Sequence, residues 1–342
     1  MTSREIVRAN LGHNTPPRIG FNWPGNRLTG APRLNDMASF GLGGSQNYAP
    51  RRWIEGNREF YDDPWGNLWV RMVGRSAKGE IIEPALKDWS QLDAYQLPDF
   101  DDPARFEHLA GIRERAGDKW LMAGMPGWIF DSSRYLRKME VYFTDLLLYR
   151  EEIDALHERV TDLLVRVIHK YAEFEPDCIF YGEDLGTQDR LLMSPALWRD
   201  VFRPHYLRLV GAAHEHGIAV FMHSCGCNWE LVPDLIEVGI DAFQFDQPAV
   251  YDMPRLAALL KENGRALWSP VDIQKIYPTG DRQLIEAEAQ KMVDLFGGNY
   301  ICMTYGDLHG IGVEPEWEEW AYQAFLRASG LDPDQVAKEL AG

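Results

Sequence analysis

His223 and Cys225 are the two residues of this sequence whose types and spacing best suit a metal ion. They lie two positions apart in the segment MHSCGCN, at the end of an apolar run that predicts a β-strand. Side chains two residues apart on a strand point to the same face, so the imidazole and the thiolate can converge. Zinc accepts nitrogen and thiolate ligands in tetrahedral geometry. The pair therefore predicts a zinc site that needs a third ligand from elsewhere in the chain.

Cys302 is the predicted third zinc ligand. It lies in the segment ICMTYGD, which predicts the last strand of a barrel, and a closed barrel brings the ends of distant strands to one pocket. Three protein ligands and one exchangeable position are typical of catalytic zinc. The spacing is equally compatible with a hydrogen-bonded core histidine at His223 and packing roles for Cys225 and Cys302. Cys227 is a reserve ligand, because one more step carries it off the strand end, and Cys178 is interpreted as a small buried residue.

Acidic residues follow several predicted strands, and Glu183 and Asp184 are the best candidates for proton transfer. They come directly after the apolar run CIFY, and Asp246, Asp272 and Asp307 follow later runs. Barrel enzymes place their active sites at this carboxyl end of the strands. The two adjacent carboxyl groups could raise one another's pKa and protonate a leaving group. The alternative is a structural role, as a helix N-terminal charge or a hydrogen bond to the loop.

Seven short apolar runs predict the strands that would position these residues, and they cover 18–22, 120–125, 178–184, 219–224, 242–246, 266–272 and 301–307. Stretches with apolar residues three and four positions apart predict helices at 208–217, 229–239, 253–264 and 281–298. An eighth strand could come from 67–74, although this run and 77–84 favour a hairpin with its turn at Lys78 and Gly79. The alternation predicts an α/β fold, a (β/α)8 TIM-type barrel.

The sequence predicts a single barrel domain over residues 1–342. Residues 1–115 are expected to form an N-terminal loop and hairpin elaboration with the first barrel strand, residues 116–330 the regular βα units, and residues 331–342 a C-terminal tail. Four tryptophans in the loops rich in glycine and proline could line an aromatic pocket, and core packing is the alternative for each. These are Trp23, Trp65, Trp69 and Trp128.

Charge and composition limit the partners of this chain. The sequence has 35 basic and 52 acidic residues and a formal net charge of -17, which argues against a nucleic-acid partner. The N-terminal segment lacks the pattern of a signal peptide, and the longest apolar runs, such as 218–222, are too short to cross a bilayer. Four cysteines are too few for a secreted disulfide framework. We therefore expect a cytoplasmic protein with a small-molecule substrate and no membrane partner, and a homodimer stays open.

Residues 182–248 resemble the central region of the uroporphyrinogen decarboxylase superfamily, with HSCG followed by PDLIEVGID as the specific signature. The resemblance covers Asp177 to Asp307 well and the N-terminal third loosely. Within the superfamily, the sequence is most similar to the zinc-dependent methyltransferases of cobamide metabolism, whose equivalents of His223, Cys225 and Cys302 bind zinc. The decarboxylases grip porphyrin carboxylates with an Arg-rich segment of the type RQAGR. This sequence lacks such a segment, so porphyrin decarboxylation is disfavoured.

The resemblance implies a methyl transfer that depends on Zn²⁺. The methyl group would move between a methylated small molecule, such as a methyl ether, or a thiol, and a corrinoid (cobalamin) carried by a partner protein. The resemblance also implies that Asp246 is an exchangeable fourth zinc ligand where the family usually has Glu, with Glu183 as the other candidate for that position. Two other functions stay open: a metal-independent decarboxylase or lyase, and a non-catalytic barrel that binds a ligand.

Overall fold

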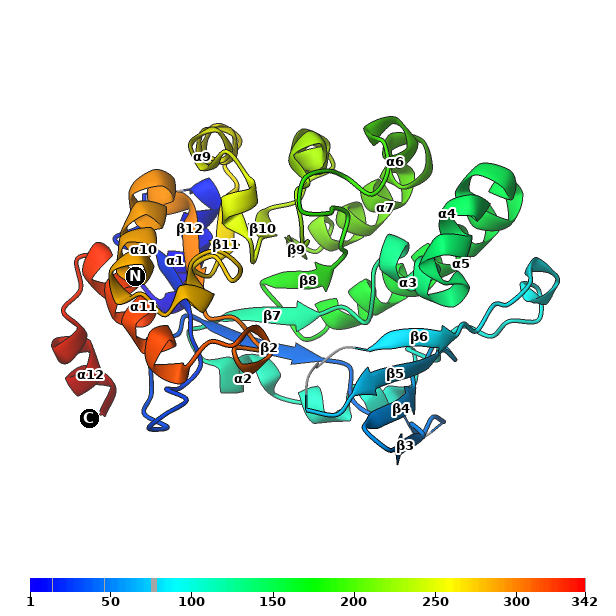
Figure 1. The fold of residues 1–342 in the computed structure, drawn as a ribbon, viewed down its shortest axis with the longest axis horizontal. Helices are drawn as coiled ribbons and strands as arrows, with labels where there is room; N and C mark the ends of the chain where they lie inside the picture. The colour runs from blue at the N-terminus through cyan, green and yellow to red at the C-terminus, as the bar shows by residue number, and fades with distance from the viewer. Residues whose placement is uncertain (14, 46, 75–78, 342) are drawn as a thin grey trace.

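The computed structural model describes residues 1–13, 15–45, 47–74 and 79–341, and within them eight parallel strands form a nearly closed barrel (Figure 1). Around the barrel the strand order is β1-β12-β11-β10-β9-β8-β7-β2. The strands are β1 (Gly20–Asn22), β2 (Met37–Gly41), β7 (Trp120–Gly124), β8 (Cys178–Gly182), β9 (Ala219–His223), β10 (Ala242–Gln244), β11 (Ala266–Ser269) and β12 (Tyr300–Met303). The predicted TIM-type barrel is confirmed, and all seven predicted runs contribute a strand.

Helices cover the outside of this barrel (Figure 1). The four helices expected from apolar spacing correspond to α7, α8, α9 and α10. Among the described residues, no helix combines the length and the apolar character needed to cross a membrane. The helices are α1 (Ser3–Arg8), α2 (Ile112–Ala116), α3 (Ile129–Arg137), α4 (Met139–Leu148), α5 (Arg150–Ala172), α6 (Pro195–Val201), α7 (Arg203–His214), α8 (Val232–Glu237), α9 (Met253–Glu262), α10 (Arg282–Phe296), α11 (Pro315–Ala328) and α12 (Pro333–Ala341).

Alternation along the strands sorts the buried side chains into two clusters. One cluster fills the inside of the barrel, and α1 and the turn after it close it with Val7 and Leu11. The other cluster joins the outward faces of the strands to the helices. The interior cluster includes Trp120, Cys178, Phe221, Trp268 and Ile301. Because side chains fill the interior, the carboxyl end of the strands is the place left for chemistry.

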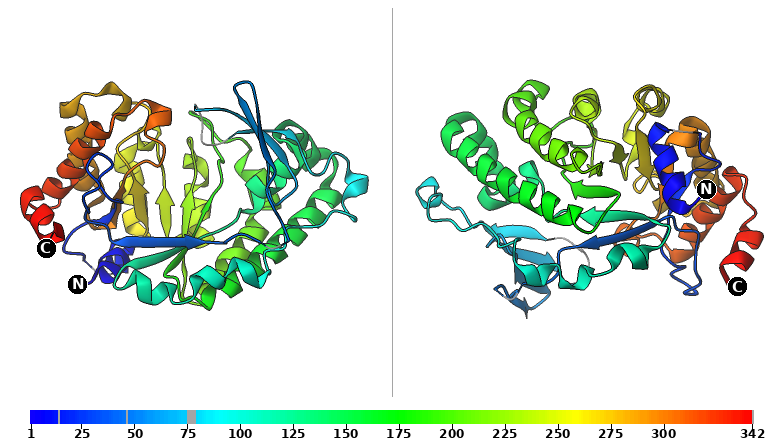
Figure 2. Two further views of the ribbon diagram at one scale, coloured as in Figure 1. Left: turned by 90° about the horizontal axis from the view of Figure 1, so that it is seen from below. Right: turned by 180° about the vertical axis from the view of Figure 1, so that it is seen from behind.

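A second sheet accounts for most of the N-terminal elaboration. Its four antiparallel strands lie at the end of the molecule away from both chain termini (Figures 1 and 2). Pairing of the last two strands confirms the hairpin expected from 67–74 and 77–84, while the expected turn residue Lys78 lies outside the described residues. The strands, in sheet order, are β3 (Arg52–Glu55), β4 (Arg58–Asp62), β5 (Leu68–Met72) and β6 (Glu80–Glu83).

The eighth barrel strand is β2, and not the run 67–74 considered from the sequence. β2 pairs with β7 from Met37 opposite Trp120 to Gly41 opposite Gly124. On its other side, Asp36 joins it to β1: the Asp36 amide donates to the Phe21 carbonyl at 2.7 Å, and the Asp36 carboxylate accepts from the Phe21 amide at 2.9 Å. The first 115 residues therefore supply two barrel strands instead of the expected one.

Candidate metal centre

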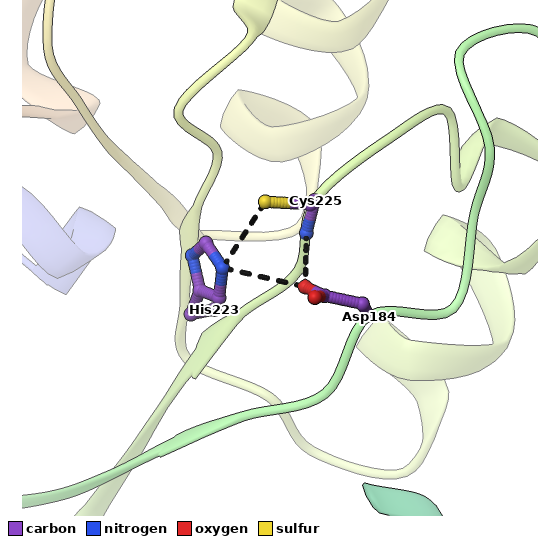
Figure 3. Close-up of side chains that lie close together, drawn as sticks. All are labelled: Asp184, His223 and Cys225. Carbon is purple, nitrogen blue, oxygen red and sulfur yellow. Dashed lines mark hydrogen bonds and ion pairs between the residues drawn. The ribbon is translucent and has the colours of Figure 1, made fainter. Parts of the chain in front are cut away.

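Asp184, His223 and Cys225 come together at the carboxyl ends of β8 and β9, with their side chains pointing toward one another (Figure 3). One ligand atom from each lies within 4.8 Å of the other two. His223 Nε2 is 3.4 Å from Cys225 Sγ and 3.5 Å from Asp184 Oδ1. The Cys225 amide donates to Asp184 Oδ1 at 3.0 Å. Imidazole nitrogen, thiolate and carboxylate are all ligands that zinc accepts, so the donor set fits this ion.

Strand register and alternation explain why these three residues meet. Gly182 at the end of β8 pairs with His223 at the end of β9. Asp184 lies two residues beyond Gly182, and Cys225 two residues beyond His223, so all three side chains occupy the face that points into the barrel. Gly226 then turns the chain with a φ of 79° against the backbone of the neighbouring loop, where a Cβ would lie 2.4 Å from a carbonyl oxygen. Glycine is required there.

The electrostatics of this group favour a bound cation. Burial alone would lower the pKa of His223, but hydrogen bonds to Asp184 and Cys225 outweigh it and raise that pKa well above its usual value. Burial raises the pKa of the Cys225 thiol. A cation bound at this group would favour the thiolate over the thiol. The His223 and Asp184 side chains are 20% and 37% exposed, so an external ligand can reach the group.

Cys302 is not brought to this group, which departs from the expectation that it is the third ligand. Ile301 and Met303 point into the barrel, and alternation turns Cys302 between them outward, into the core beneath the helices. It is fully buried there, and burial raises the pKa of its thiol well above its usual value. Within the described residues, the group of potential ligands contains neither Cys302 nor the reserve ligand Cys227.

Asp246 lies on the opposite side of the His223 imidazole from Asp184 and Cys225. Its Oδ2 is 3.8 Å from His223 Nδ1, whereas Cys225 and Asp184 face Nε2. Between Asp246 and the ring lies Gln244, whose Oε1 contacts His223 Nδ1 and whose Nε2 donates to Asp246 Oδ1 at 2.5 Å. Burial raises the pKa of Asp246. Within the described part of the chain, the group of potential ligands does not include Asp246.

Glu183 points away from Asp184, so the two do not form a carboxyl pair. Its Oε1 accepts from the amides of Phe130 and Asp131 at the start of α3, and its Oε2 accepts from the Tyr206 hydroxyl. Burial, followed by the charge of Asp131, raises its pKa well above the usual value. This is the structural alternative considered for Glu183, a carboxyl group at a helix N-terminus.

Two other acidic residues at strand ends also have structural roles, since Asp272 and Asp307 accept backbone hydrogen bonds in their own loops.

Sequence reasoning missed Gln244 and Tyr305. Tyr305 follows β12 at the barrel mouth, and its pKa is raised to about 12 by burial and by the charges of Asp246 and Cys225. The signal for Gln244 was its place on a predicted strand, two residues before Asp246. A polar residue within an apolar run points to a partner inside the fold.

Two cavities lie beside the four-stranded sheet, and one of them reaches the metal group. The larger, of about 650 Å³, lies at the ends of β2 and β7 and is lined by Trp65, Trp69 and Tyr135 among others. The second, of about 530 Å³, is also lined by Trp69 and Tyr135 and reaches Asp184. The rings of Trp69 and Tyr135 meet edge to face at 5.0 Å between the two spaces. A small molecule in the second cavity would therefore lie beside the metal group.

The four tryptophans singled out in the sequence divide between these cavities and the core. Trp65 and Trp69 line the larger cavity, as an aromatic pocket requires. Trp23 and Trp128 are fully buried, and Trp128 stacks on Tyr181 with ring centroids 3.8 Å apart. Core packing, the alternative considered for each, thus describes Trp23 and Trp128.

One family model and one solved methyltransferase structure agree with this fold. The family model described as uroporphyrinogen decarboxylase (URO-D) matches residues 70–327, well over half of the chain. A comparison with curated proteins found no match. Among solved structures, a methyltransferase from Methanosarcina mazei is similar with a TM-score of 0.60 and 15% identity over 78% of this chain and 76% of that one. A D-psicose 3-epimerase has a TM-score of 0.42 and 13% identity over 70% and 86%.

Proposed function

The chain belongs to the uroporphyrinogen decarboxylase (URO-D) family, and we propose that within it the protein is a zinc-dependent methyltransferase. The methyl group would pass between a small-molecule substrate, such as a methyl ether or a thiol, and a corrinoid held by a partner protein. The observation that carries this proposal is the convergence of Asp184, His223 and Cys225 at the catalytic end of the barrel. The likeness in fold to a methyltransferase supports it.

We assign the zinc ligands to Asp184, His223 and Cys225. The carboxylate and the thiolate carry two negative charges, which match a divalent cation, and the neutral imidazole adds no charge. When bound, zinc would act as a Lewis acid on the substrate heteroatom that holds or receives the methyl group. Three protein ligands leave one position for that heteroatom, as in catalytic zinc sites. The cavity beside Asp184 supplies the space from which the heteroatom would approach.

The two cavities also support a substrate with an apolar or flat body. Trp69 and Tyr135 would hold such a body by ring packing and keep water from the reacting atoms. The corrinoid would supply the methyl-carrying cobalt. We assign it to a separate protein, as the resemblance to the cobamide methyltransferases implies. We also propose that the protein acts in the cytoplasm.

Metal analysis of the purified, reduced protein tests the proposal first. We expect about one zinc per chain, and we expect loss of zinc in Cys225→Ala and in His223→Ala. Cys227→Ala is the matched control, because Cys227 lies two residues from Cys225 but outside the ligand group; it should keep its zinc. A wild-type protein without zinc would refute the metal site, and activity without metal would favour the decarboxylase or lyase alternative.

An assay of methyl transfer then tests the reaction. The protein is mixed with a panel of methyl ethers and thioethers and with free cob(I)alamin, and the corrin absorption spectrum reports methylation of cobalt. We expect turnover with at least one donor, abolished in Cys225→Ala and kept in Cys227→Ala. Equal methylation by wild type and Cys225→Ala would show that the metal group does not take part.

A further inference from the structure

The Gln244 side chain is buried between the His223 imidazole and the Asp246 carboxyl group. It is 3% exposed and lies on β10, directly opposite His223 on β9. Both side chains point into the barrel, because they share a register position and a face. The Gln244 Oε1 atom contacts His223 Nδ1, and the Gln244 Nε2 atom donates to Asp246 Oδ1 at 2.5 Å. These contacts form a continuous chain from the carboxylate to the imidazole.

The hydrogen-bonding roles of the three side chains fix the orientation of the Gln244 amide. The Gln244 amide nitrogen donates to Asp246 Oδ1, so the nitrogen faces the carboxyl group. The amide oxygen must then face His223, and it accepts the Nδ1 proton. A proton on Nδ1 leaves the lone pair on Nε2. Nε2 is the atom that faces Cys225 Sγ and Asp184 Oδ1, at 3.4 Å and 3.5 Å.

From this geometry we infer that Gln244 and Asp246 are positioning residues, which hold His223 in the Nδ1-protonated tautomer and aim Nε2 at the metal. This inference rests on the metal site of the proposed function. It gives Asp246 a role different from the fourth-ligand position that resemblance to the family implied for it. In metal sites, such outer hydrogen bonds commonly orient ligand histidines, and their loss lowers metal affinity.

The test measures zinc affinity and the coordination of cobalt in matched variants of the whole chain. Apoprotein is titrated with zinc in competition with a chromophoric chelator, and Co²⁺-loaded protein is examined for its d–d and thiolate charge-transfer bands. Gln244→Leu should weaken zinc binding about 10- to 100-fold and broaden the cobalt spectrum. Gln290→Leu, the same substitution at an exposed glutamine on α10, should change neither.

Asp246→Asn separates positioning from direct coordination. Its amide oxygen can still accept from Gln244, so we expect a smaller loss than in Gln244→Leu and an unchanged cobalt spectrum. Direct coordination by Asp246 predicts the reverse order, together with loss of an oxygen ligand in X-ray absorption. That result would overturn the inference and would leave the zinc site itself intact.

A single and a double variant, in which the carboxyl and amide groups of positions 244 and 246 are exchanged, distinguish a positioning effect from misfolding. In Gln244→Glu the new carboxylate still accepts from Nδ1 but faces the Asp246 carboxylate, so zinc affinity should fall. Adding Asp246→Asn supplies an amide donor to Glu at position 244, and the double variant should recover most of the affinity. No recovery in a folded double variant would refute the inference. Wild-type protein without zinc would instead refute the proposed function.

Discussion

Cys225 and Cys302 are one side-chain type in two environments, and they should respond differently to the same substitution. Cys225 lies in the partly exposed ligand group, whereas Cys302 lies in the core beneath the helices. We expect Cys225→Ala to lose zinc. Cys302→Ala should keep zinc and lower the free energy of unfolding by about 1 kcal/mol, the cost of a small core cavity. Metal analysis and urea unfolding measure both effects, and loss of zinc in a folded Cys302→Ala would reinstate Cys302 as a ligand.

Glu183 should make the stability of the protein depend on pH. Burial raises its pKa well above the usual value, so between about pH 4.3 and the raised pKa the unfolded chain has lost a proton that the folded chain retains. The stabilisation is therefore complete below the unfolded pKa and is lost as the pH rises through the folded one. In Glu183→Gln this component is absent. Urea unfolding of both proteins at pH 5 and pH 8 should give a larger advantage of wild type at pH 5; a constant difference would contradict the shift.

The sequence predicted the residues that share one strand better than those that come from different strands. His223 and Cys225 are two apart, so they face the same side wherever the strand begins. Glu183 and Asp184, just after β8, and Cys302 and Met303, on β12, are adjacent pairs in which a shift of one residue exchanges the inward for the outward position. The apolar runs do not fix that shift, because both faces of these strands are buried. For this reason the sequence did not show that Asp184 lies in the metal group and that Cys302 lies outside it.

At the scale of elements, the junction of α3 and α4 holds a strained residue. Lys138 has a φ of 66° and a ψ of 146°, a conformation that residues with a Cβ rarely adopt. Lys138→Gly removes the strain and adds some entropy to the unfolded chain, so we expect the free energy of unfolding to rise by about 1 kcal/mol. Lys138→Ala retains the Cβ and should show no gain. Equal gains in the two variants, measured by urea unfolding, would assign the effect to the charge of Lys138.

The strand β2 shows which elements could not be predicted. Its sequence MASFG contains alanine, serine and glycine, so no apolar run marks it, and its conformation depends on pairing with β7. The seven predicted strands have longer apolar runs because helices cover their outer faces and side chains fill the barrel inside. Of the four-stranded sheet, only the β5–β6 hairpin could be predicted, because its two runs lie close together in the sequence.

For the whole molecule, the seam between β1 and β2 decides whether the barrel closes, and Asp36 is the residue at that seam. Its carboxylate is fully buried and accepts from Arg18 Nη1 and Nη2 at 2.6 Å and 2.7 Å, from the Phe21 amide at 2.9 Å, and from the Ser3 hydroxyl at 2.8 Å. Removing one partner of a buried ion pair leaves the other charge without compensation. We therefore expect Asp36→Ala to lower the free energy of unfolding by about 3–5 kcal/mol.

The zinc content of Asp36→Ala shows whether closure of the barrel and assembly of the metal site are independent. β8 and β9 are not at the seam between β1 and β2, because β7 separates β8 from β2 and three strands separate β9 from β1. Asp36→Ala should therefore keep about one zinc per folded chain while it unfolds at a lower urea concentration. Asp200→Asn is the control for the loss of an acidic residue, since Asp200 pairs with Arg150 on the surface and its removal should cost less than about 1 kcal/mol. If Asp36→Ala were as stable as Asp200→Asn, backbone pairing alone would hold the seam, and the carboxylate would have no part in closing the barrel.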